Sequence, residues 1–378
     1  MLWSISPPPI TADPSRHRLV GCRARCRRVG SLVVTSLGTT EDLPDETSQL
    51  PVEWQHAAAD LQRVAQRRFV DRWTAEVVSA FRAEGIRPIL LKGPAIARWL
   101  YSEADDRSYC DVDLLVSPAE LSHAEDVLRE IGFDEPDHPR WLLPHARAWM
   151  RASDGANVDL HRTLHAMEAL SPESVWAETL AGAETCVVGG VGVDIPGEVM
   201  RTLQVVLHRT PGEDPRSQVS EDLRRALAQV DPPTWRAAAD MATRLGVADD
   251  MGHLLREIPE GSVLADHLGL PSIGSLRSYA VAGLGRSEPL TSGYSFWCFG
   301  SLPTYRAKVR WLVQRQFPSR GYMEQRYRLA RTGAAGLGAS YVVRLVVSCV
   351  CLPAATVNWV RFRHQLKNRL GGRSPARW

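Results

Sequence analysis

Two aspartates separated by one residue, Asp111 and Asp113, stand at the start of the apolar run of residues 111–116. Side chains alternate between the two faces of a strand, so a strand over this run points both carboxylates the same way. Two neighbouring carboxylates are costly to keep charged in a buried place unless a cation lies between them. Because their oxygens prefer hard divalent ions, the pattern favours Mg²⁺, or else Mn²⁺, over zinc.

A third carboxylate, Asp159, lies in residues 156–161, where apolar and polar residues alternate after an Asp-Gly turn that predicts a hairpin. Asp159 and His161 should share the strand face opposite the core, and His161 is expected to support Asp159. We predict that Asp159 joins Asp111 and Asp113. Three carboxylates can hold two metal ions, and Asp159 can accept the proton of an attacking hydroxyl.

The turn at Lys92 and Gly93 offers groups that suit a phosphate. Glycine permits close approach of the backbone, and the helix predicted from Pro94 points its amino end at the same place. Lys92 supplies a positive charge, and Arg107 is expected to clamp another phosphate oxygen. The sequence therefore predicts a nucleotide-binding group of Lys92, Gly93 and Arg107 beside the three carboxylates.

A small mixed sheet with helices packed against it would position these residues. Periodicity, Gly and Pro signals predict such elements in the first part of the chain and mostly helices after residue 165. The predicted elements are a helix over 54–82, a strand over 86–91, a helix over 94–100, a strand over 111–116, a helix over 118–131 and the hairpin strands 148–153 and 156–161. The fold class is α/β (α+β).

Three sequence runs, LLKGPAIARWLY, DDRSYCDVDLLV and VDLHRTLH, together resemble the uncharacterised bacterial nucleotidyltransferase family of the DNA polymerase β-like superfamily. The family's hallmarks are an LKG turn, an R…DxDLLV strand and a later [DE]LH strand, and a fainter likeness extends over 55–335. The residues on matching positions are Lys92, Gly93, Arg107, Asp111, Asp113, Asp159 and His161.

The resemblance implies a polymerase β-like nucleotidyltransferase domain with a small mixed sheet, followed by a mostly helical domain. It implies Mg²⁺-dependent transfer of a nucleoside monophosphate from a nucleoside triphosphate, ATP among them, to an acceptor hydroxyl, with release of pyrophosphate. Two features depart from the superfamily: its usual Gly-Ser turn is Lys-Gly here, and the interval from Gly93 to Asp111 is long.

Four regions are expected along the chain. Residues 1–50 form a disordered or mis-assigned N-terminal extension, 51–165 the catalytic domain, 166–335 a helical substrate domain, and 336–378 a basic and apolar tail. The substrate cleft is expected between the catalytic and helical domains.

Charge is distributed unevenly along the chain. Residues 1–30 carry +5 and residues 305–378 carry +14, and subtracting both from the net +2 leaves −17 for residues 31–304. We expect residues 306–331 to pack within the protein and residues 361–378 to make a weak contact with a polyanion.

Localisation and metal content are predicted from a few further features. The seven cysteines form no pair of CxxC motifs, which indicates reduced thiols in the cytoplasm. The apolar run 341–360 contains Arg344, Pro353 and Asn358, so a buried or interfacial helix pair is expected, with peripheral membrane contact as the alternative. No metal-ligand spacing is found among the four histidines His145, His161, His165 and His208.

Other functions fit parts of the pattern. A glycosyltransferase also uses a DxD motif to hold a metal and a nucleotide sugar, but only a short ordered stretch precedes the first strand. A non-catalytic protein that binds nucleotides or nucleic acid is the other alternative. The acceptor is a small molecule, a tRNA or a protein, and the sequence does not choose among them.

Overall fold

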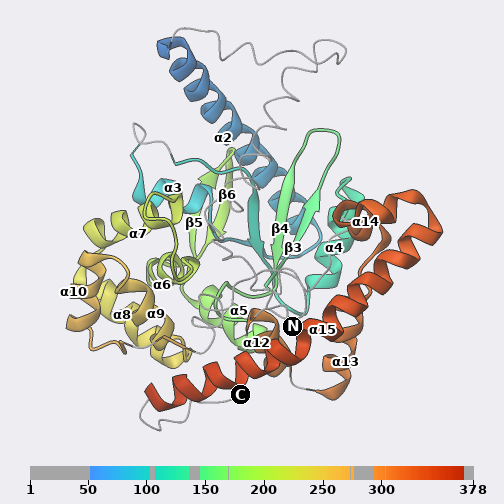
Figure 1. Cartoon of the computed structure of the whole chain (residues 1–378). Helices are drawn as coiled ribbons and strands as arrows, with labels where there is room; N and C mark the ends of the chain where they lie inside the picture. Colours follow the sequence, from blue (N-terminus) through green and yellow to red (C-terminus); the bar gives the residue numbers. More distant parts are fainter. Residues whose placement is uncertain are drawn as a thin grey trace.

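A six-stranded sheet forms the centre of the computed structural model, which describes residues 52–102, 107–135, 145–168, 170–272, 274–275, 293–302 and 304–369 (Figure 1). The predicted extension 1–50 lies outside these residues. The strands are β1 (Ile89–Leu90), β2 (Val112–Leu115), β3 (Ala146–Met150), β4 (Asn157–His161), β5 (Glu184–Val188) and β6 (Val191–Ile195).

The strands lie in the order β3-β4-β2-β1-β6-β5. β2 pairs with β4 and β1 with β6 in parallel, whereas the other three pairs are antiparallel, which confirms the mixed sheet expected from the sequence. The hairpin of β5 and β6 follows residue 165 in the chain but completes the sheet beside β1. The predicted domain boundary at 165 therefore does not coincide with the end of the sheet.

One face of the sheet packs against two helices, α2 (Val52–Ala83) and α4 (Leu121–Glu130). Figure 1 shows α2 running along the sheet and projecting beyond it. The strands contribute the alternate residues Leu90, Val112 and Leu114 to this core, all fully buried. Since side chains alternate along a strand, the neighbouring residues of β2 point to the opposite face.

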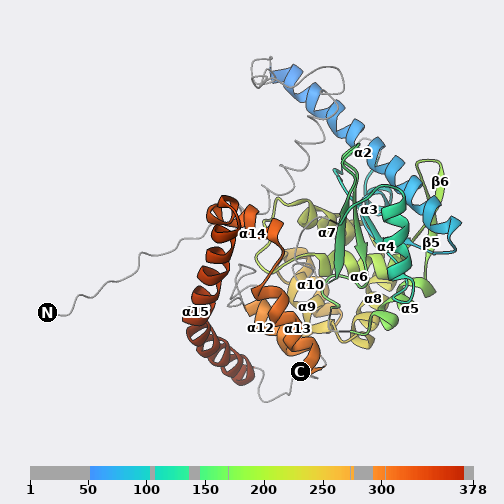
Figure 2. The same cartoon turned by 90° about the vertical axis from the view of Figure 1, so that its right-hand side faces the viewer.

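The opposite face packs against a group of helices, α5 to α10, that lies beside the sheet in Figures 1 and 2. Ile89, Leu91 and Leu115 of the sheet share one continuous core with these helices. The helices are α5 (Pro172–Ala181), α6 (Glu198–His208), α7 (Gln218–Gln229), α8 (Pro232–Arg244), α9 (Ala248–Leu255) and α10 (Pro259–His267). α10 extends into residues 260–300, a Gly- and Ser-rich region whose sequence shows little helical periodicity.

Local sequence signals explain where several of these helices begin. Ser171, Ser217 and Asp231 each precede a helix and accept a hydrogen bond from a backbone N–H of its first turn. The short helix α3 (Pro94–Leu100) begins with proline, whose fixed backbone angle suits the first turn. These caps define the helix ends, and the apolar faces determine where the helices pack.

A separate group of helices ends the chain (Figure 2). They are α12 (Gly293–Ser301), α13 (Tyr305–Gln316), α14 (Arg320–Arg326), the 3-10 helix η2 (Arg328–Thr332) and α15 (Ala334–Arg369). α13 and α14 contact α15, in keeping with the internal packing expected for 306–331.

The helix α15 is one continuous helix that includes Pro353, so the expected helix pair is wrong. Contacts on both sides of the proline hold the helix: Arg344 donates to the Arg315 carbonyl at 2.8 Å, and Trp359 stacks on Phe296 at 5.8 Å. Its buried side includes polar residues such as Ser340, Arg344 and Ser348.

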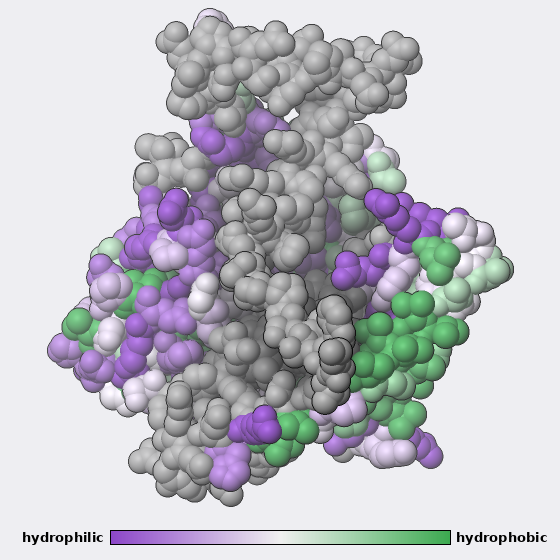
Figure 3. All heavy atoms as spheres, in the orientation of Figure 1, coloured by the Kyte–Doolittle hydropathy of each residue, from purple (hydrophilic) through white to green (hydrophobic). Residues whose placement is uncertain are grey.

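Apolar residues on the other side of α15 are exposed, and Figure 3 shows them gathered over this helix at the right of the molecule. They include Val342, Val346 and Val350. Among the helices that the structure describes, none is both long and apolar enough to cross a membrane.

Candidate active site

Asp113 and Asp159 lie side by side on the parallel strands β2 and β4, where the register pairs one with the other. Asp111 immediately precedes β2. Because Val112 and Leu114 face the core with α2 and α4, Asp113 points toward the helical side of the sheet. The prediction that Asp159 lies on a strand next to Asp113 is confirmed, whereas the catalytic and metal-binding roles of the three carboxylates stay predictions.

Lys92 lies next to this carboxylate pair. Its ammonium nitrogen Nζ is 3.1 Å from Oδ1 of Asp113, and both side chains are largely buried. Burial alone would lower the pKa of Lys92, but the negative charges of Asp113 and Asp111 outweigh it and raise that pKa above its usual value. Lys92 therefore stays protonated and neutralises part of the carboxylate charge.

His161 contacts the same carboxylate. Its Nε2 donates to Oδ1 of Asp113 at 2.9 Å, and its side chain is 1% exposed. His161 was expected to support Asp159, but the structure places it on Asp113, which lies diagonally across the strand pair. Burial would raise the pKa of Asp113, but Lys92 and the hydrogen bond from His161 hold it well below its ordinary value.

Gly93 forms the turn that brings Lys92 to this site. Its backbone has a φ of 57°, in the left-handed region that favours glycine, and it precedes α3 directly. Arg107 Nη1 donates to the Gly93 carbonyl at 3.4 Å.

The Arg107 guanidinium makes its shortest contacts with a residue of the helical side. Nε and Nη2 donate to the two carboxylate oxygens of Asp222 on α7, at 2.9 and 2.7 Å. Both side chains are buried, 8% and 5% exposed. These contacts favour a structural role for Arg107 between the sheet and α7, and its contact with phosphate stays a prediction.

A family model described as an uncharacterised nucleotidyltransferase matches residues 20–258, which is more than half of the chain. This chain belongs to that nucleotidyltransferase family. Membership confirms the family, the mixed α/β fold and the enzyme class expected from the sequence, and it favours nucleotidyl transfer over the glycosyltransferase alternative. No curated protein matches the chain.

Two solved structures are similar to this nucleotidyltransferase. The solution structure of the antibiotic-resistance factor ANT(2'')-Ia is 14% identical with a TM-score of 0.33, and the match covers 47% of this chain and 93% of that one. The crystal structure of an antigenic nucleotidyltransferase-like protein from Paracoccidioides brasiliensis is 14% identical with a TM-score of 0.37, over 57% of this chain and 97% of that one. Since both TM-scores are low, the family assignment rests on the family match.

The donor chemistry of the three carboxylates of this nucleotidyltransferase fits a divalent ion such as Mg²⁺, because all three offer oxygen ligands: Asp113 and Asp159 are paired across β2 and β4, and Asp111 directly precedes β2. One of the three carboxylates, Asp113, also accepts hydrogen bonds from Lys92 and His161. In the part of the chain that the structure describes, another group already has three donor atoms within 4.8 Å of one another: His145, His165 and Glu168.

Sequence reasoning missed two features around the site. Asp222 accepts hydrogen bonds from Gln218 and, from more than a hundred positions earlier, from Arg107 and Tyr101, and no local pattern marks it as the partner of the last two. The second is a row of histidine rings, with centroids 5.2 to 6.1 Å apart, formed by His161, His145, His165 and His208. The sequence shows no metal-ligand spacing among these histidines, because the hairpin of β3 and β4 brings His145 to His161, and His208 comes from the end of α6.

Proposed function

We propose that this nucleotidyltransferase moves a nucleoside monophosphate from a nucleoside triphosphate to an acceptor hydroxyl and releases pyrophosphate. The supporting observation is the register that puts Asp113 beside Asp159 on parallel strands, with Lys92 on Asp113. Asp111, Asp113 and Asp159 would hold Mg²⁺, or Mn²⁺ in its place. When bound, such an ion supplies positive charge for the triphosphate and the leaving group.

The transfer forms a bond between the acceptor oxygen and the α-phosphorus and breaks the bond from that phosphorus to the oxygen that bridges the α- and β-phosphates. Pyrophosphate leaves with the electron pair of the broken bond. The acceptor hydroxyl loses its proton, which we assign to the Asp159 carboxylate. Asp159 suits this role because the parallel register places it beside Asp113, so that its carboxylate lies next to the proposed metal site.

Lys92 and Gly93 form the proposed phosphate side of the site. Lys92 is protonated, lies on Asp113 and contributes positive charge to an incoming polyphosphate. Gly93 lets the turn approach the phosphates without a side chain. For Arg107 the contacts with Asp222 and Gly93 support a positioning role, in which it holds the Lys92-Gly93 turn against α7.

The acceptor is a small molecule, a tRNA or a protein. We propose that it binds beside the carboxylates, on the side of the sheet that carries the helices α5 to α10. A weak contact of residues 361–378 with a polyanion remains part of the proposal, and residues 370–378 of this segment lie outside the described chain.

The experiment that tests this function incubates the full chain with Mg²⁺, cell extract and each nucleoside triphosphate, labelled in turn at the α- or the γ-phosphate. Nucleotidyl transfer labels an acceptor from the α-position only, and the γ-label appears in pyrophosphate. Phosphoryl transfer would label the acceptor from the γ-position and would contradict the proposal.

Asp111→Asn is the matched inactive variant, because it removes a charge needed for metal binding with little change in volume. Its transfer rate should fall below a tenth of the wild-type rate at saturating Mg²⁺. Asp126→Asn is the control, since Asp126 is an exposed carboxylate on α4 that pairs with Arg129. It should transfer at the wild-type rate. Full activity of Asp111→Asn would remove Asp111 from the site.

A further inference from the structure

His145, His165 and Glu168 form a compact cluster next to the carboxylate site. The Nδ1 atoms of His145 and His165 lie 3.5 and 3.8 Å from Oε1 of Glu168. The three side chains are well enclosed, with 13%, 10% and 2% of their surfaces exposed. All three donor atoms lie within 4.8 Å of one another, which is close to the spacing of ligands around one ion.

The fold holds the two halves of this cluster together from different strands. His145 directly precedes β3, and its carbonyl accepts hydrogen bonds from the backbone N–H groups of Arg162 and Thr163 at 3.0 and 3.4 Å. His165 and Glu168 lie in the segment that follows β4. The β3–β4 ladder therefore fixes the distance between the first ligand and the segment that carries the other two.

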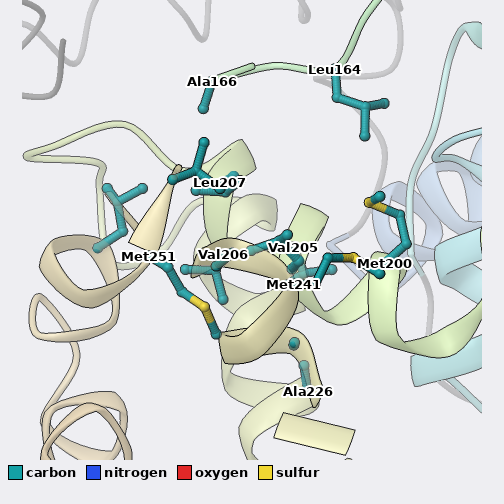
Figure 4. Close-up of a cluster of buried hydrophobic side chains, with 14 of the residues drawn as sticks. Leu164, Ala166, Met200, Val205, Val206, Leu207, Ala226, Met241 and Met251 are labelled. Atoms are coloured by element: carbon teal, nitrogen blue, oxygen red, sulfur yellow. The ribbon is translucent and has the colours of Figure 1, made fainter. Parts of the chain in front are cut away.

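Apolar residues of the segment 164–168 anchor it in the hydrophobic core. Leu164, Ala166 and Met167 are buried in the core shared with the helices, and Figure 4 shows Leu164 and Ala166 above Leu207 and Met200. Ala166 has a φ of 71°, the positive value of a strained backbone for a residue with a side chain. This turn separates His165 from Glu168 and lets both side chains reach the same point.

The charges around the cluster favour a cation. Glu168 is buried, and the neighbouring network contains the carboxylates of Asp111, Asp113 and Asp159 with the ammonium of Lys92. A buried carboxylate that faces two imidazole rings is stabilised by a cation that these three side chains can bind together.

We propose that His145, His165 and Glu168 form a transition-metal site of the zinc type, separate from the oxygen-ligand site for Mg²⁺. Two imidazoles and one carboxylate match the ligands that zinc takes, and ligand bonds of about 2.0–2.2 Å put neighbouring donor atoms at about the separations found here. The ion ties the segment after β4 to the start of β3.

The two sites are neighbours through one side chain. The rings of His145 and His161 lie 5.5 Å apart, and His161 donates to Asp113. An ion bound by His145 would therefore also restrain the neighbouring ring of His161 and, through its hydrogen bond, Asp113. This inference concerns binding of a second metal and does not depend on the transferase reaction, so its test is independent of activity.

The test uses the full chain, freed of metal with a chelator and titrated with Zn²⁺ in excess Mg²⁺, which is added to fill the proposed carboxylate site. We expect one equivalent of Zn²⁺ to bind to the wild type and stoichiometric binding to be lost in Glu168→Gln and His165→Ala. His123→Ala is the matched control, because His123 also lies near a glutamate, at 3.7 Å from Glu84, but both side chains are about half exposed. It should bind Zn²⁺ like the wild type, as should Asp111→Asn.

A second measurement needs no variant. Hydrogen exchange of the wild-type chain should slow on addition of Zn²⁺ in residues 145–150 and 162–168, and the melting temperature should rise, because binding to the folded state alone stabilises it. Three results would overturn the proposal: no stoichiometric Zn²⁺ binding, unchanged binding in Glu168→Gln and His165→Ala, or Zn²⁺-induced protection elsewhere in the chain.

Discussion

Removal of Asp222 should destabilise the protein far more than removal of its neighbour in sequence. Asp222 receives two hydrogen bonds from Arg107, at 2.9 and 2.7 Å, and one from Tyr101 at 2.7 Å. Asp222→Ala leaves the guanidinium charge of Arg107 buried, with 8% of its side chain exposed and its principal partner gone. A buried pair broken on one side costs about 3–5 kcal/mol, so we expect a loss of that size in the free energy of unfolding.

The assay is equilibrium unfolding in urea, followed for the full chain at neutral pH. Glu221→Ala is the matched control on the same helix, because Glu221 pairs with Arg224 and Arg225 at the surface and is 40% exposed. Exposed pairs contribute about 0–1 kcal/mol, so this variant should unfold at nearly the wild-type urea concentration.

A double substitution distinguishes the cost of losing the ion pair from the cost of leaving the Arg107 charge buried without its partner. Arg107→Met with Asp222→Leu should recover much of the loss, because an apolar pair of similar volume leaves no buried charge. Tyr101→Phe alone should cost about 0.5–1.5 kcal/mol for one hydrogen bond. A cost below about 1 kcal/mol for Asp222→Ala, similar to that of Glu221→Ala, would refute the view that this ion pair joins α7 to the sheet.

The remaining predictions concern the site and the tail. Lys92→Ala should weaken nucleoside triphosphate binding by about 1.5–3 kcal/mol, because one charge-assisted contact is lost, and calorimetry with unchanged affinity would contradict this. Because Lys92 and His161 hold the pKa of Asp113 below its unfolded value, Asp113 contributes stability above about pH 4 and loses that contribution as the pH falls further. Urea unfolding of Asp113→Asn should show a shallower acid dependence than the wild type, and an equal slope would disprove it. Deletion of residues 361–378 should leave the melting temperature nearly unchanged, and a large drop would show that these residues belong to the fold.

Substitution of Asp113 is expected to affect stability as well as activity. From the sequence, Asp113→Asn should abolish transfer and leave the fold intact. The carboxylate of Asp113 is buried and accepts from both Lys92 and His161, so its loss also weakens packing around the site. Asp111→Asn is the cleaner probe of metal binding, because Asp111 precedes the strand and is only partly buried.

Local patterns determined the elements that carry the site. Alternation along 111–116 and 156–161 put Asp113 and Asp159 on definite strand faces, since the two-residue period of a strand is a property of the backbone. Gly93 and Pro94 marked the turn and the start of α3 for the same kind of reason. The resemblance to the nucleotidyltransferase family was drawn from these local runs, and the match to the family over residues 20–258 confirms it.

Tertiary structure decided which of those elements meet. The hairpin of β5 and β6 completes the sheet beside β1, and Arg107 finds Asp222 across 115 positions, because burial of apolar faces is optimised over the whole chain. The same holds for His145, which no spacing links to His165 and Glu168 until β3 pairs with β4. Side-chain direction is a local property of the sequence, whereas the neighbour that a side chain contacts depends on how the entire chain buries its core.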